Sequence, residues 1–107
     1  MKIELLYFEG CPNHEPAMKI LREALESSGL QSRIEEVQVR TQSEAEATGF
    51  VGSPSIRING SDIEPRARTA TVFGLSCRTY VHGSQHSGVP SRELLRDAII
   101  EAIREDS

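Results

Sequence analysis

Cys11 is the residue whose type and position most clearly suggest chemistry. It follows the apolar stretch 2–8 and precedes Pro12 and His14. A cysteine at the start of a helix faces unpaired backbone N–H groups and the positive end of the helix dipole, and both favour the thiolate. The thiolate is the nucleophilic and metal-binding form of cysteine. We therefore expect a reactive thiol at Cys11, the alternative being a buried structural cysteine at a strand end.

Two further residues could act together with Cys11. His14 stands three residues later, where a protonated imidazole would assist the thiolate. Cys77 could be a distant resolving thiol, because the connection 61–74 would span on the order of 45 Å when extended. Its other interpretation is a small apolar residue in a strand. If residues 75–81 run antiparallel to the third strand, they begin at the end of the sheet remote from Cys11, which disfavours the pairing.

Histidine and cysteine together also raise the question of a metal site. His82 and His86 stand four residues apart, but the glycine and serine between them disfavour a helix. With Cys11, His14 and Cys77 they would form a nitrogen and sulfur ligand set suited to zinc or a softer ion. No pair of Cys-x-x-Cys motifs fixes such a site. We therefore favour solvated loop histidines and assign no metal ligand.

Length and charge limit the class of protein. The 107 residues fit a single domain, residues 1–107, and a net charge of −4 argues against a nucleic-acid partner. Apolar runs are too short for a bilayer span and the first residues lack a signal-peptide pattern, so we expect no membrane association and a cytoplasmic location. A reducing compartment disfavours a permanent disulfide between the two cysteines. Four arginines are either solvated or line a site for an anionic partner: Arg57, Arg66, Arg68 and Arg78.

Hydrophobic periodicity predicts the strands that position these residues. Residues 2–8 are apolar enough for a buried strand, and residues 33–40 alternate in part, as in a strand exposed on one face. Residues 54–58 alternate after a proline and end in an Asn-Gly turn. We expect the long connection 61–74 to follow that turn, and residues 75–81 to form a fourth strand. A connection of that length in a small domain is functional or disordered.

Three helices are predicted between and after these strands. Residues 17–27 place apolar side chains on one helical face, and the helix starts either near Cys11 or later, with Asn13 as its cap. Residues 41–48 form a short capped helix before a glycine, and residues 91–103 form a longer helix with a continuous apolar stripe. A helix between the first two strands implies a parallel, right-handed crossover. Residues 82–88 are expected to be a polar loop.

This order of elements resembles the thioredoxin fold. The resemblance spans nearly the whole chain, and its most informative motifs are Cys-Pro-Asn-His at 11–14 and Gly-Ser-Pro-Ser at 52–55. It implies an α/β domain with about four strands in a mixed sheet, flanked by three helices. In that superfamily the proline before the third strand is usually cis and packs against the active cysteine, as Pro54 would here. Substrate contacts would come from Pro12, Pro54 and Ser53, whose backbone would be an open edge for an added substrate strand.

The resemblance also bears on the chemistry. His14 occupies the position of the second cysteine of Cys-x-x-Cys, which makes a disulfide within the motif impossible. We therefore expect a thiol–disulfide oxidoreductase without a cofactor, in which Cys11 attacks and Cys77, a glutathione-like low-molecular-weight thiol or a protein disulfide partner takes part in the exchange. The alternative is a non-enzymatic binding module. It would hold zinc or mercury through Cys11 and Cys77, or dock a protein through the face around Pro54.

Overall fold

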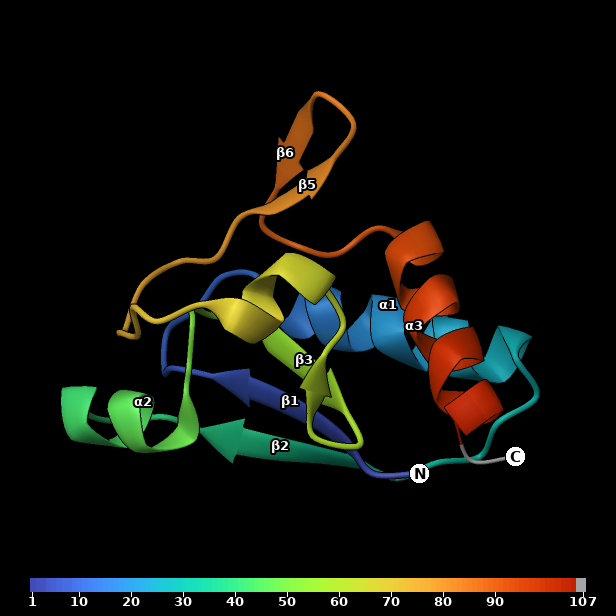
Figure 1. The fold of residues 1–107 in the computed structure, drawn as a ribbon, viewed down its shortest axis with the longest axis horizontal. Coiled ribbons are helices and arrows are strands. Elements are labelled where there is room, and N and C mark those ends of the chain that lie inside the picture. Colours follow the sequence, from blue (N-terminus) through green and yellow to red (C-terminus); the bar gives the residue numbers. More distant parts are fainter. Residues whose placement is uncertain (106–107) are drawn as a thin grey trace.

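A four-stranded mixed sheet forms the centre of the structure, a computed structural model that describes residues 1–105 (Figure 1). Its strand order is β2-β1-β3-β4. β1 (Ile3–Tyr7) runs parallel to β2 (Ile34–Gln38) and antiparallel to β3 (Ser55–Ile58), which in turn pairs antiparallel with β4 (Ser61–Asp62). The predicted α/β class, with four strands and three helices, is confirmed. The arrangement is loosely thioredoxin-like.

One face of the sheet is apolar and is covered by α1 (His14–Ser27) and α3 (Arg92–Glu105). Side chains alternate between the two faces of a strand, so every second residue of β1 and β3 points to this side. None of the helices in residues 1–105 has the length and apolar character needed to cross a membrane. The buried side chains at the centre of this core include Ile3, Leu5, Ile56, Leu21, Leu95 and Ile99.

Helix α1 begins after the cysteine motif. Asn13 is its N-cap residue and Pro16 lies in its first turn, which matches the later of the two predicted starts. A proline is tolerated there because the first N–H groups of a helix have no partner within the helix. Cys11 therefore lies before the helix, in a loop closed by a 3.3 Å hydrogen bond from its N–H to the carbonyl of Phe8.

The opposite face of the sheet carries a smaller apolar cluster of Leu6, Val39, Ala45 and Phe50. Ala45 belongs to the short helix α2 (Gln42–Thr48), which has the predicted caps. The hydroxyl of its first cap residue accepts a 3.1 Å hydrogen bond from the backbone N–H of Glu44, and a left-handed glycine ends the helix. Asp62, which pairs with Arg57 of β3, also lies on this side of the sheet.

The chain after β3 differs most from the prediction. The Asn59-Gly60 turn leads directly into β4, because both residues adopt the positive φ that a two-residue hairpin requires. A 3-10 helix, η1 (Pro65–Thr69), follows. Of the strand predicted over 75–81, only residues 80 and 81 are in a strand, and that strand does not join the central sheet.

Residues 80–87 form a separate hairpin of β5 (Tyr80–His82) and β6 (Gln85–Ser87). The polar loop expected over residues 82–88 is therefore mostly part of this hairpin. Figure 1 shows this hairpin projecting from the rest of the domain.

Candidate thiol site

The Cys11 loop (residues 8–13) and the Ser53-Pro54 peptide are neighbours at one end of the sheet. The N–H of Phe8 lies 3.4 Å from Ser53 Oγ, while the carbonyl of Phe8 accepts the hydrogen bond from Cys11. The Ser53-Pro54 bond is cis, as the resemblance implied. Ser53 and Pro54 are buried, whereas Cys11 is half-buried and Pro12 is exposed. The Cys11 loop therefore reaches the surface next to a buried turn.

Cys77 reaches the same end of the sheet by a route that the sequence did not indicate. It lies in residues 75–79, the Cys77 segment, which forms a parallel bridge with Ser53. The N–H of Ser53 donates to the carbonyl of Ser76 at 2.8 Å, and the N–H of Arg78 donates to the carbonyl of Ser53 at 2.9 Å. Directly paired residues direct their side chains to the same side, so the side chain of Cys77 is on the side of the Ser53 hydroxyl.

This placement changes two predictions. The objection to a Cys77 partner assumed that residues 75–81 form the fourth strand of the sheet, but that position is taken by β4. The bridge instead brings the Cys77 segment to the end where Cys11 lies. Both residues are free thiols, and Cys77 is exposed. The open backbone edge expected at Ser53 is not present, because the chain itself occupies it.

A buried ion pair holds the Cys77 segment in place. The guanidinium of Arg78 donates two hydrogen bonds of 2.7 Å to the two carboxylate oxygens of Asp62, and one of 3.1 Å to Ser55 Oγ. The carboxylate of Glu64 lies 3.4 Å away. Arg78 is 6% exposed, and Asp62 and Glu64 are each 8% exposed. An unpaired charge at this depth is costly, so the ion pair fixes Arg78 and with it the neighbouring Cys77.

Tyr80 connects this ion pair to the cis peptide. Its ring lies 4.3 Å from the guanidinium of Arg78, and its hydroxyl donates to the carbonyl of Pro54 at 2.7 Å. Burial lowers the pKa of Arg78, but the hydrogen bond to Asp62 and the surrounding negative charges outweigh it, so the pKa is raised. Burial raises the pKa of Tyr80 despite the opposing charge of Arg78. The guanidinium stays charged and the phenol stays a donor.

The ring of His14 is held by residues of the sheet. It stacks on Tyr7, with ring centroids 3.8 Å apart and planes 10° apart, and its Nε2 lies 2.8 Å from Glu36 Oε1. These contacts connect the start of α1 to β1 and β2. They give His14 a structural role, and the assistance to Cys11 expected from the sequence stays a prediction.

The chain that follows β6 also contacts the Cys11 loop. A Cβ atom at Gly88 would collide with the side chain of Asn13. The absence of a side chain at Gly88 therefore permits this close approach to the start of α1. Asn13 makes no side-chain hydrogen bond to cap the helix. Its side chain instead packs against this returning chain.

The candidate zinc ligands are not brought together. His82 lies on β5, where its Nε2 is 3.5 Å from a carboxylate oxygen of Glu93, and His86 lies on β6. Within residues 1–105, no three side chains of the histidine, cysteine, aspartate and glutamate types are grouped so that they could hold a metal ion. A soft ion needs only two thiolates, and that possibility depends on Cys11 and Cys77 alone.

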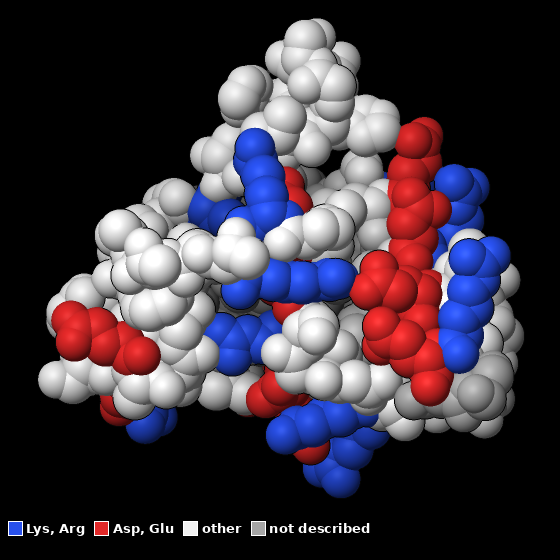
Figure 2. All heavy atoms as spheres, viewed as in Figure 1, with Lys and Arg blue, Asp and Glu red and all other residues white. Residues whose placement is uncertain are grey.

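The four arginines do not form one anion site. Arg78 is buried and neutralised, while Arg66 and Arg68 pair with carboxylates at 3.4 and 3.1 Å. Arg57 donates a 3.0 Å hydrogen bond to a backbone carbonyl. On the side of the molecule seen in Figure 2, cationic side chains lie at the centre and acidic side chains lie along α3. The positive charge on this face is therefore largely compensated by neighbouring groups.

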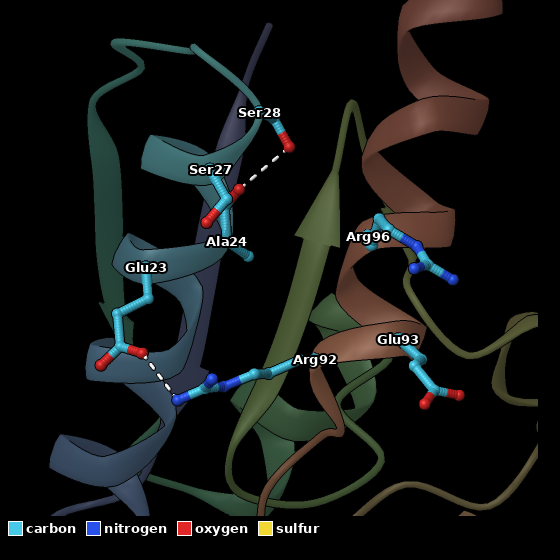
Figure 3. A pocket seen from close by; sticks show the side chains of 7 residues that line it. All are labelled: Glu23, Ala24, Ser27, Ser28, Arg92, Glu93 and Arg96. Atoms are coloured by element: carbon cyan, nitrogen blue, oxygen red, sulfur yellow. Dashed lines mark hydrogen bonds and ion pairs between the residues drawn. The ribbon is translucent and has the colours of Figure 1, made fainter.

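A groove between α1 and α3 lies away from the cysteines (Figure 3). The guanidinium of Arg92 crosses it to a carboxylate oxygen of Glu23 at 3.0 Å. On the α1 side, Ser28 Oγ donates to the carbonyl of Ala24 at 2.9 Å. The groove is lined by the C-terminal half of α1 and the first turns of α3, whereas Cys11 precedes the other end of α1. The groove is therefore separate from the thiol site.

Comparison with known proteins places the chain in a family. No curated protein and no solved structure matches it. The region that matches a family, residues 13–99, contains His14, Ser53, Pro54 and Cys77 and begins two residues after Cys11. That family is described as "Domain of unknown function (DUF2703)", and the chain belongs to it.

Proposed function

We propose that this protein is a cytoplasmic thiol-redox protein of the thioredoxin-like superfamily, with a Cys-Pro-x-His form of the active-site motif. Cys11 is the nucleophile of thiol–disulfide exchange and Cys77 is its partner within the chain. The supporting observation is the parallel bridge between Ser53 and Cys77, next to the Phe8 residue that closes the Cys11 loop. A dithiol that begins its reaction reduced suits a reducing compartment.

The exchange has two steps. The thiolate of Cys11 attacks one sulfur of an external disulfide, a mixed disulfide forms, and the first thiolate leaves. The thiolate of Cys77 then attacks the sulfur of Cys11, and the second thiolate leaves. The external disulfide gains two electrons, and the protein loses two as its thiols form a disulfide. The exposed Pro12 borders the incoming disulfide. No cofactor is needed.

Reaction of the reduced protein with an aromatic disulfide such as dithiobis(nitrobenzoate) tests this proposal. We expect the wild type to release both halves of the reagent and to keep neither, because Cys77 displaces the half bound to Cys11. Cys77→Ser should release one half and keep the other on Cys11. Cys11→Ser should react slowly and without displacement. Mass spectrometry of the products distinguishes these results.

Two outcomes would contradict the proposal. Separate adducts on both cysteines of the wild type would remove Cys77 as the partner. A Cys11 that is slower than Cys77 in the single-cysteine variants would remove its role as the nucleophile.

The same two thiols support one alternative, a module that binds a soft ion such as Hg²⁺ between Cys11 and Cys77. Equilibrium dialysis of the reduced protein measures this directly. Uptake that requires both cysteines, in a protein that does not exchange with disulfides, would favour this module. Docking of a protein through Pro54 has less support, since that residue is buried.

A further inference from the structure

We infer that the thiol site accepts small disulfides and excludes disulfides within extended polypeptides as long as the Cys77 segment is in place. This inference rests on the proposed function and concerns its substrate class.

The first argument concerns backbone hydrogen bonds. An extended polypeptide joins a protein by pairing with free N–H and carbonyl groups at a sheet edge. Beside the Cys11 loop those groups belong to Ser53 and Pro54. The N–H and the carbonyl of Ser53 are bonded to the Cys77 segment at 2.8 and 2.9 Å. Pro54 has no N–H, and its carbonyl accepts from Tyr80 at 2.7 Å. The chain thus occupies the edge that a polypeptide substrate would need.

The second argument is that the Cys77 segment is firmly held. Its displacement would separate Arg78 from Asp62 and Glu64 and leave buried charges without partners. The segment also packs directly on Gly52. A Cβ there would lie 3.1 to 3.2 Å from atoms of Arg78 and Ser76. A polypeptide that competed for Ser53 would have to break these contacts first.

The third argument concerns access for small molecules. A small disulfide needs only an approach to the sulfur of Cys11 and no backbone pairing. Cys11 is half-buried, and Gly10 and Pro12 on either side of it are exposed. Cys77 is exposed, so a mixed disulfide on Cys11 can be displaced from the solvent side. The site therefore favours a small disulfide over a chain.

A matched pair of substrates tests this inference. The small substrate is the disulfide of N-acetylcysteine methylamide, and the large substrate carries the same disulfide within a short unstructured peptide. The rates of both with dithiothreitol provide the reference ratio, which removes differences in intrinsic reactivity. We expect the reduced protein to react with the peptide at least about tenfold more slowly than that reference ratio predicts. A peptide chain beside Cys11 would give up hydrogen bonds to water and could not replace them by pairing with Ser53. A ratio equal to the reference would overturn the inference.

Variants sharpen the test. Arg78→Met removes the ion pair that holds the Cys77 segment and should bring the peptide ratio closer to the reference. Tyr80→Phe frees only the carbonyl of Pro54 and should shift it less. Arg92→Ala lies in the separate groove and should leave the ratio unchanged. If Arg78→Met does not fold, the wild-type ratio still decides. The inference would be contradicted if Arg78→Met folds and exposes the Ser53 amide but still discriminates against the peptide as strongly as the wild type.

The failure of this inference differs from the failure of the proposed function. If Cys11 reacts with neither substrate, the function itself is excluded. If it reacts equally well with both, only the substrate class is wrong.

Discussion

The two faces of the central sheet are held by different kinds of interaction. On the α1 and α3 side, Ile3, Leu5 and Ile56 are fully buried in an apolar core. On the other side, beyond a small apolar cluster, Arg78 and Asp62 make a buried ion pair that holds a loop against the sheet. Apolar burial is non-directional, whereas an arginine–carboxylate pair has a defined geometry. Both faces therefore stabilise the fold, but only the second also fixes the position of the segment that carries Cys77.

Arg78→Met should have the largest effect on stability. It leaves two buried carboxylates without a cationic partner but keeps much of the side-chain volume. We expect the free energy of unfolding to fall by about 4 kcal/mol. Urea denaturation followed by circular dichroism measures the loss. Hydrogen exchange at the Ser53 amide, which donates to Ser76, should accelerate beyond what the loss of global stability explains.

Leu21→Ala on the other face is the matched control. It removes a fully buried side chain from α1 and should cost about 3 kcal/mol. Its Ser53 amide should exchange faster only in proportion to the lost global stability. If both variants changed the Ser53 amide in the same way, the division of labour between the two faces would be wrong.

Tyr80→Phe should have an intermediate effect that depends on pH. At neutral pH we expect a loss of about 1–2 kcal/mol, because the buried carbonyl of Pro54 loses its donor. Burial raises the pKa of Tyr80 in the folded protein, next to Arg78, Asp62 and Glu64. The stability that its neutral phenol provides is therefore fully present below about pH 10, where the unfolded chain ionises, and is lost above it.

Denaturation curves at several alkaline pH values test this sign. The wild type should lose stability more steeply than Tyr80→Phe above about pH 10, and the two curves should converge. Ionisation of lysines is common to both proteins and cancels in the difference. A constant difference between the curves over this range would show that the ionisation of Tyr80 does not affect stability, which would contradict this prediction.

Arg92→Ala should have the smallest effect. Its ion pair with Glu23 joins α1 to α3 at 3.0 Å, but its side chain is 80% exposed, so we expect a loss of less than about 1 kcal/mol. High salt should abolish this loss, since exposed charges are screened. The effect of Arg78→Met should persist in salt. A salt-insensitive loss in Arg92→Ala would indicate packing rather than charge.

The parts of the fold that depend on local pattern were predicted from the sequence. The apolar stripe of α3, the caps of α2 and the buried strand β1 each have a periodicity or a capping residue within a few positions. The cis bond before Pro54 was predicted from the Gly-Ser-Pro-Ser motif, whereas the reactivity of Cys11 stays a prediction. These features depend on residues that are close together in the sequence, so the sequence alone was enough to predict them.

The position of the Cys77 segment could not be predicted in this way. It depends on the ion pair between Arg78 and Asp62, and the sequence between these two residues has no repeating pattern. One signal was available: Asp62 is the second residue after the Asn59-Gly60 turn, in a returning strand that pairs with β3. A carboxylate at such a position needs a cation. Several arginines could have supplied it, and only the structure distinguishes Arg78 from the others.

The β5–β6 hairpin is a suitable place to attach a label. Its two ends are fixed, by the hydrogen bond of Tyr80 and by the approach of Gly88 to Asn13, while residues 82–87 between them are exposed (Figure 1). Exposed loop tips with fixed ends tolerate insertions well. A fluorophore or an affinity tag inserted after Gly83 would leave the sheet and both cysteines unaltered. The insertion would still be attached to the segment that carries Cys77.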